Sequence, residues 1–166
     1  MVKKQKAMDY QREAGIARLK EFEREVLAKI PPLRFDIRTF VDEETVLRDP
    51  TGISSLEEYW GADCGTVACA MGWAAMYPPF VELGFQVSRG ESGNLLGGIE
   101  FWDGRIGRKR YGIEAVETFF SLAEGEGMWL FHGLSYREDE VVDLGEVRER
   151  VRKFLEREEE SVCVKE

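Results

Sequence analysis

Residues 64–76 constrain the fold more than any other part of the chain, because none of them is charged. Their sequence, Cys-Gly-Thr-Val-Ala-Cys-Ala-Met-Gly-Trp-Ala-Ala-Met, is dominated by small residues, and two prolines follow at 78 and 79. A helix that is apolar on every side belongs in the interior of a fold. We therefore predict a buried central helix at about 65–76, entered at Gly65 or Thr66 and ended by the prolines.

Amphipathic patterns predict a longer helix at each end of the chain. In the first, at about 4–29, apolar residues recur at spacings of three, four and seven. This stripe consists of Met8, Gly15, Ile16, Leu19, Phe22 and Val26. The second, at about 144–160, has Asp143 as its predicted N-cap and leaves residues 161–166 as a tail. Its predicted core residues are Leu144, Val147, Val151, Phe154 and Leu155.

The segment between these helices predicts a small sheet and further helices. Alternating apolar and polar residues at 85–88 and 99–102 indicate a β-hairpin at about 85–102. Asp103-Gly104 is a turn signal. Shorter helices are expected at about 113–120 and 124–131. The sequence thus predicts one mainly α domain, 1–166, built as a helical bundle around the central helix, with one hairpin.

Composition restricts the classes of function. The chain has 166 residues and a formal net charge of −9, which disfavours binding to duplex nucleic acid. It lacks the run of about 20 apolar residues that a membrane-spanning helix requires, and no apolar signal-peptide core follows its N-terminal lysines. Three cysteines are too few for a disulfide framework in a chain of this length. We expect a cytoplasmic protein that does not contact membranes.

Residues 64–74 resemble the motif C-G-T-x-x-C-x-x-G-[HW]-A of a family of small uncharacterised bacterial and phage proteins. The resemblance runs from about Leu33 to Leu155. It includes Arg34-Phe35-Asp36, Pro79-Phe80 with Leu83-Gly84, and Phe119-Phe120-Ser121-Leu122 followed by Trp129-Leu130-Phe131. Ser121 stands where the family usually has glycine, and Ala123 where a serine or threonine would cap the next helix. The resemblance implies a shared fold and no mechanism.

The cysteines do not match a metal site. A structural zinc ion needs four ligands, usually with cysteines two to four positions apart. Cys64 and Cys69 have four residues between them, and on a helix such positions diverge by about 140°. The only histidine is His132. We expect no metal and no cofactor, and we expect the cysteines to be small, inert core residues.

Cys64 has an alternative interpretation as a nucleophile. The sequence Asp63-Cys64-Gly65 is similar to the start of the catalytic helix in NlpC-type cysteine peptidases. A helix N-terminus would lower the pKa of the thiol, and His132 could act as the base. However, His132 lies in a predicted helix end, and no residue that would orient it is apparent. A thiol-dependent hydrolase using Cys64 and His132 therefore stays an alternative, and we expect no enzyme.

Two features favour a binding protein instead. At the predicted entrance of the central helix, Gly65 exposes backbone N–H groups and Thr66 adds a hydroxyl group, a combination that binds anions unless Asp63 itself caps the helix. A basic cluster follows the hairpin beside Trp102 and Tyr111, and it consists of Arg105, Arg108, Lys109 and Arg110. Cations beside aromatic rings can hold a nucleotide or an acidic peptide.

We therefore predict a non-catalytic binding protein, an accessory or phage-type effector. Its partner would be a small, anionic, nucleotide-like ligand or another protein, and the oligomeric state is left open. The predicted ligand-binding residues are Gly65, Thr66, Trp102, Arg105, Arg108 and Lys109. If the basic cluster serves a partner, its side chains should project into solvent instead of pairing internally.

Overall fold

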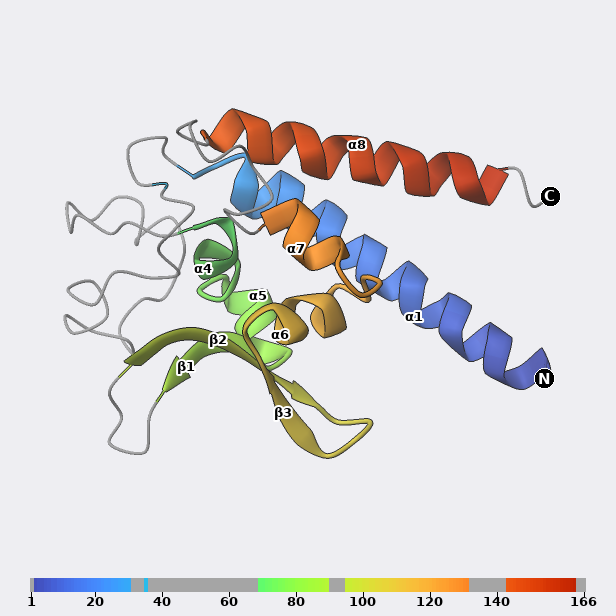
Figure 1. Cartoon of the computed structure of the whole chain (residues 1–166), viewed down its shortest axis with the longest axis horizontal. Helices are drawn as coiled ribbons and strands as arrows, with labels where there is room; N and C mark the ends of the chain where they lie inside the picture. The colour runs from blue at the N-terminus through green and yellow to red at the C-terminus, as the bar shows by residue number, and fades with distance from the viewer. Residues whose placement is uncertain (1, 31–34, 36–68, 90–94, 132–142, 164–166) are drawn as a thin grey trace.

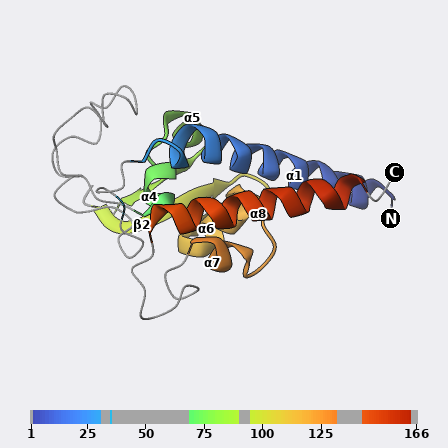
Figure 2. The same ribbon diagram turned by 90° about the horizontal axis from the view of Figure 1, so that it is seen from above.

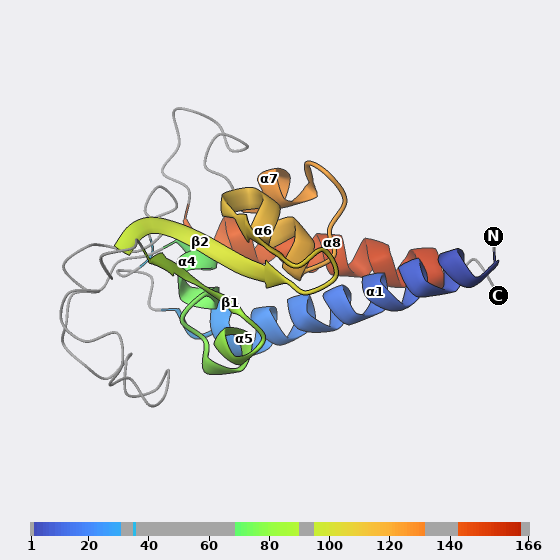
Figure 3. The same ribbon diagram turned by 90° about the horizontal axis from the view of Figure 1, so that it is seen from below.

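The computed structural model describes residues 2–30, 35, 69–89, 95–131 and 143–163, which are mostly helical with one small antiparallel sheet. Two long helices, α1 (Val2–Glu21) and α8 (Leu144–Cys163), lie side by side in opposite directions (Figures 1 and 2). The shorter helices lie between this pair and the sheet, and Figure 3 shows the sheet in front of the helices when seen from below. The helices thus cover one face of the sheet.

The first helix changes its winding before it ends. After α1, the π-helix η1 (Phe22–Leu27) continues the chain, and the N–H of Ala28 donates to the carbonyl oxygen of Glu23 at 3.0 Å. The side chain of Leu27 is fully buried, and its carbonyl oxygen accepts hydrogen bonds of 2.9 and 2.8 Å from the guanidinium of Arg148 on α8. The predicted N-terminal helix is confirmed in position, but apolar spacing does not reveal the π turn.

The last helix is longer than predicted. It continues to Cys163, so residues 161–163 of the expected tail are helical. No glycine or proline follows residue 145 to end it earlier. Its start is as predicted: the Asp143 carboxylate accepts from the N–H of Glu146 at 2.9 Å, and the Glu146 carboxylate accepts from the N–H of Asp143 at 3.2 Å. The predicted core residues of this helix are all at most 5% exposed: Leu144, Val147, Val151, Phe154 and Leu155.

The described part of the small-residue segment is buried from Cys69 to Ala75, but the segment is not one helix from 65 to 76. Helix α4 spans Ala70–Ala74, and residues 65–68 lie outside the described residues. Cys69 is extended and is the N-cap, because its Sγ accepts from the N–H of Gly72 at 3.4 Å. This corrects the expected entrance at Gly65 or Thr66. The predicted burial of Cys69, Gly72 and Ala75 is confirmed, whereas Ala68 is not described.

The two prolines end one helix and begin another. Helix α5 (Pro78–Glu82) starts directly at Pro78, where the missing N–H costs nothing because a first-turn N–H has no helical partner. Tyr77 precedes it and donates its hydroxyl hydrogen to the Glu21 carboxylate at 3.1 Å, which links α5 to the end of α1. Burial and this hydrogen bond raise the pKa of Tyr77 to about 12. No pattern in the sequence had indicated α5 beyond the prolines that end the preceding segment.

The sheet has three antiparallel strands in the order β1-β2-β3. Strands β1 (Phe85–Arg89) and β2 (Leu95–Asp103) confirm the predicted hairpin, with Phe85 opposite Phe101. Strand β3 (Arg108–Tyr111) was not predicted. It pairs with β2 after the turn that begins at Gly104.

The core lies between the sheet and the helices. Helices α6 (Gly112–Phe119) and α7 (Glu126–Phe131) confirm the predicted helices in this region, with starts shifted by one and two residues. The Phe119 ring stacks on Phe85 of β1 at 4.5 Å and lies edge-on to Phe101 of β2 at 5.4 Å. Aromatic rings from α6 therefore fill the space above the inner face of the sheet.

Candidate functional site

The predicted site residues fall into two groups. Cys64, Gly65, Thr66 and His132 lie outside the described residues, so the anion site and the thiol site stay predictions. The other predicted residues, Trp102, Arg105, Arg108 and Lys109, lie on or between strands β2 and β3. The sheet therefore carries the part of the site whose geometry can be described.

Strand register divides these residues between two faces. Phe101 points to the core, so Trp102 points away from it, because successive residues of a strand alternate. Lys109 lies directly opposite Trp102, and Tyr111 lies opposite Glu100. We call the surface formed by Gln86, Glu100, Trp102, Lys109 and Tyr111 the outer face.

Two aromatic residues dominate the outer face. Trp102 is 53% exposed and Tyr111 is 56% exposed, although both belong to regular strands. They are diagonal neighbours across β2 and β3, a spacing of about 7–8 Å that large side chains can bridge. Gly84 lies beside Trp102 and adopts a φ of +87°, and the N–H of Trp102 donates to its carbonyl oxygen at 3.3 Å.

The charges on the outer face neutralise one another. The Glu100 carboxylate is nearly buried, at 4% exposure, and accepts from Lys109 Nζ at 2.7 Å and from Gln86 Nε2 at 2.8 Å. This hydrogen bond raises the pKa of Lys109, so its ammonium group keeps its charge. Lys109 is the cation of the outer face, and it is paired with Glu100. The five residues of the outer face are therefore aromatic or polar, without an unpaired cation.

The residues of the basic cluster form ion pairs within the chain. A cluster that serves a partner was expected to project its side chains into solvent instead of pairing internally. Arg105 donates from Nε to Asp103 Oδ1 at 2.9 Å, and Arg110 Nε lies 3.5 Å from Asp103 Oδ2. Arg110 also contacts the Glu114 carboxylate, which lies 3.7 Å from Arg108 Nη2. By our criterion, these contacts favour a structural role for Arg105 and Arg110.

Asp103 gives this cluster a pH dependence. The carboxylate is 2% exposed, and hydrogen bonds from Arg105 hold its pKa below the ordinary value of 3.8. A lowered folded-state pKa stabilises the fold above the ordinary pKa, and this stabilisation is lost as the pH falls through the folded-state value. We expect Asp103→Asn to lower the free energy of unfolding by about 1 kcal/mol at pH 7. Urea titrations should show that this difference shrinks below pH 3.8; a constant difference would contradict the assignment.

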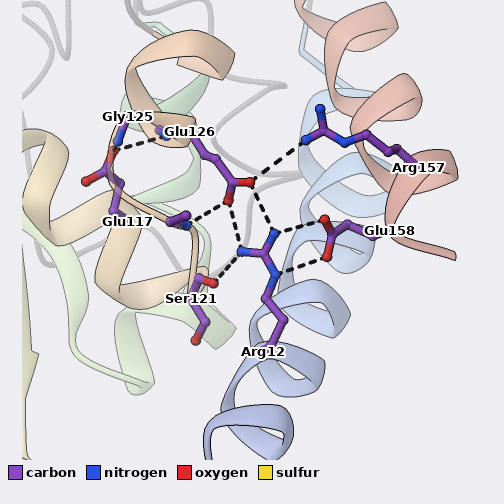
Figure 4. A network of polar contacts seen from close by, with 9 residues as sticks. Arg12, Glu117, Ser121, Gly125, Glu126, Arg157 and Glu158 are labelled. Atoms are coloured by element: carbon purple, nitrogen blue, oxygen red, sulfur yellow. Dashed lines mark hydrogen bonds and ion pairs between the residues drawn. The ribbon is translucent and has the colours of Figure 1, made fainter. Parts of the chain in front are cut away.

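A second charged network joins both long helices to the loop between α6 and α7. Arg12 on α1 donates to Glu126 at 2.9 Å, to Glu158 of α8 at 3.0 Å and to the carbonyl oxygen of Ser121 at 2.7 Å (Figure 4). Arg157 of α8 also approaches Glu126, at 3.8 Å. This network holds α1, α8 and the start of α7 together.

The network also replaces the helix cap that Ala123 cannot supply. The Glu126 carboxylate accepts from the N–H of Ala123 at 2.7 Å, which is one half of a capping box. Glu117 of α6 accepts from the N–H groups of Gly125 at 2.8 Å and Gly127 at 3.2 Å. A carboxylate from the preceding helix therefore performs the role of the missing serine or threonine.

Ser121 adopts a backbone conformation that favours glycine. Its φ is +51°, in the left-handed region, which glycine adopts without steric cost. We expect Ser121→Gly to raise the free energy of unfolding by about 1 kcal/mol, because the strain is removed. Chemical denaturation measures this change. The same substitution at the helical, exposed Ser161 should not stabilise the protein, and an equal gain at both positions would rule out strain as the cause.

An open pocket of about 550 Å³ lies between α1, the end of α6 and the turn before β3. Most of its charged groups already have intramolecular partners: Arg12 and Arg105 bind carboxylates, Glu114 contacts Arg108, and Glu117 caps α7. A ligand would have to displace these contacts. The pocket is therefore a weaker candidate site than the outer face.

Further observations and three comparisons bear on function. Among the described residues, no cluster of three potential metal ligands occurs. No helix within that part of the chain is long and apolar enough to cross a membrane. In comparisons with known proteins, no family model, curated protein or solved structure matches the chain.

Proposed function

We propose that this chain is a non-catalytic interaction protein that binds a protein partner through the outer face of its sheet. The observation that carries the proposal is the pair Trp102 and Tyr111, each more than half exposed on strands that are otherwise well paired. Tryptophan and tyrosine are enriched among the residues that dominate protein–protein binding energies. Exposed aromatic groups on a rigid sheet lose little conformational freedom when they bind.

The charges of the outer face favour a protein over a small anion. Lys109 already pairs with the buried Glu100, so an incoming phosphate would compete with an internal carboxylate. A protein partner can cover both aromatic rings and leave that pair intact. A small anionic ligand at Gly65 and Thr66 is the second possibility within the same class of binding protein.

The sequence suggests a class of protein and a cellular compartment for this binding function. The resemblance at residues 64–74 suggests an accessory or phage-type effector in a bundle built around the small-residue segment. Cys69 is buried, and three cysteines are too few for a disulfide framework in a chain of this length, which suits a reducing compartment such as the cytoplasm.

A double variant of the outer face tests the proposal. We expect Trp102→Ser combined with Tyr111→Ser to weaken capture of protein partners about tenfold or more, since single hot-spot residues contribute 2 kcal/mol or more. Quantitative affinity capture from a host lysate measures the effect, and thermal unfolding verifies the fold. Tyr10→Ser is the matched control, because Tyr10 is 73% exposed but lies on α1.

Two outcomes would contradict the proposal. Equal capture by the double variant and the wild type would exclude the outer face as the binding surface. A folded Cys64→Ser variant that loses the function would favour the thiol-dependent hydrolase, because serine keeps the volume but is a poor nucleophile without an activating base. Titration with iodoacetamide would then identify a hyper-reactive Cys64.

A further inference from the structure

Strand β3 is one edge of the described sheet, and its register shows which backbone groups face outward. The N–H of Trp102 donates to Gly84 on the β1 side. In an antiparallel sheet, successive residues direct their N–H and C=O groups to opposite sides. Lys109 faces Trp102 and Tyr111 faces Glu100, so neither exchanges backbone hydrogen bonds with β2. Lys109 therefore directs both its backbone N–H and its C=O group to the open edge. Tyr111 directs its N–H there, whereas its carbonyl group belongs to the N-cap of α6 and accepts within that helix.

The side chains of these two residues belong to the outer face. A strand added at the edge would hydrogen-bond to the N–H and C=O groups of Lys109 and to the N–H of Tyr111. Alternate side chains of that strand would lie beside the exposed Tyr111 ring. Within the described part of the chain, no other strand pairs with β3. Edge pairing and the aromatic outer face thus form one continuous surface.

The charge of the edge selects the partner. Three consecutive residues of β3, Arg108 to Arg110, are cationic in a chain of net charge −9. The Arg108 side chain is 65% exposed and Lys109 is 44% exposed, whereas Arg110 is 19% exposed. Of the carboxylates that pair with them, Glu100 and Asp103 are 5% and 2% exposed and Glu114 is 54% exposed. Two exposed cations, Arg108 and Lys109, thus stand beside one exposed carboxylate, Glu114, so the edge presents a net positive charge.

We propose that β3 is a docking edge to which an extended, acidic peptide segment of a protein partner adds as a fourth strand. This inference rests on the proposed function and names the form and charge of the partner. Main-chain hydrogen bonds supply affinity in this mode of recognition, and alternate side chains supply specificity. A second copy of β3 is disfavoured, because like charges opposite each other destabilise a strand pair.

The test uses a fluorescein-labelled octapeptide of alternating glutamate and valine, with fluorescence anisotropy as the readout. We expect it to bind, and we expect the lysine–valine octapeptide to bind about tenfold more weakly or worse. N-methylation of one alternating set of peptide residues should abolish binding, and N-methylation of the other set should be tolerated, because only one edge of the peptide pairs. Arg108→Glu should weaken binding about tenfold, whereas Arg152→Glu, an exposed cation on α8, should not.

The outcomes distinguish this inference from the proposed function. Binding that tolerates both N-methylated peptides, or the absence of binding, overturns the docking edge and leaves the Trp102 and Tyr111 capture experiment to decide the outer face. Equal capture by the wild type and the variant carrying both Trp102→Ser and Tyr111→Ser, with peptide binding as expected, overturns the proposed function and leaves the docking edge in place. A dimer that Arg108→Glu dissociates would assign the edge to a second copy of the chain and also overturn the inference.

Discussion

Gly15→Ala is expected to lower the free energy of unfolding by about 3 kcal/mol or more, the largest effect of any single substitution considered. A Cβ atom at this position would lie 2.0 Å from the carbonyl oxygen of Phe120 and 2.5 Å from Ser121 Cβ. The closest atom, the carbonyl oxygen of Phe120, belongs to the backbone, so no side-chain rotation relieves the collision. Helix α1 would therefore have to move away from the end of α6. The direction is informative, because glycine to alanine inside a helix normally stabilises by about 1 kcal/mol.

Urea denaturation measures this effect, with Gly104→Ala as the control. A Cβ atom at Gly104 would meet no atom within 4 Å, and the residue is in a turn with no positive φ. We expect the control to change stability by less than about 0.5 kcal/mol. A stabilising Gly15→Ala variant would show that α1 does not pack against α6 as described.

Arg12→Ala is expected to lower the free energy of unfolding by about 2 kcal/mol. The substitution leaves Glu126, Glu158 and the Ser121 carbonyl oxygen without their shared donor (Figure 4). Hydrogen bonds to charged groups contribute about 1.5–3 kcal/mol, and we take the lower half of this range because the Arg12 side chain is 29% exposed. Burial raises the pKa of Glu126, but hydrogen bonds from Arg12 and the Ala123 N–H outweigh it, and the net pKa is lowered.

A double-mutant cycle with Glu126→Ala isolates the pair. The two substitutions together should cost clearly less than the sum of their separate effects, since each removes the same interaction. Arg152→Ala is the matched control, because Arg152 is 58% exposed and, among the described residues, its ion pairs are with Glu149 and Glu156 of the same helix. Strict additivity in the cycle would mean that Arg12 stabilises the protein through its other contacts and not through Glu126. These contacts are Glu158, the Ser121 carbonyl oxygen and the Phe154 ring.

The candidate site shows which of its neighbours could be predicted from residue types and their order along the chain. The sequence placed Trp102, Arg105, Arg108 and Lys109 in one cluster, because they are close along the chain. The structure keeps Trp102 and Lys109 together on the outer face, but it bonds Arg105 to Asp103 and to Gln11 on α1. Tyr111 had been noted beside the cluster, and strand register makes it a neighbour of Trp102 on that face. Register is the deciding factor, because a shift of one residue moves every side chain to the opposite face.

What the sequence determined by itself was the set of elements whose burial is periodic or complete. The stripes of both long helices, the alternation of the hairpin and the uncharged segment around Ala70 report burial directly, and the described residues bear them out. Elements and contacts that lack such a pattern became known only from the tertiary structure. Strand β3 reads Arg-Lys-Arg-Tyr and forms because β2 offers it an edge, and Arg12 meets Glu158 across 146 positions of the chain. Such contacts depend on the path of the chain through space, which local patterns do not encode.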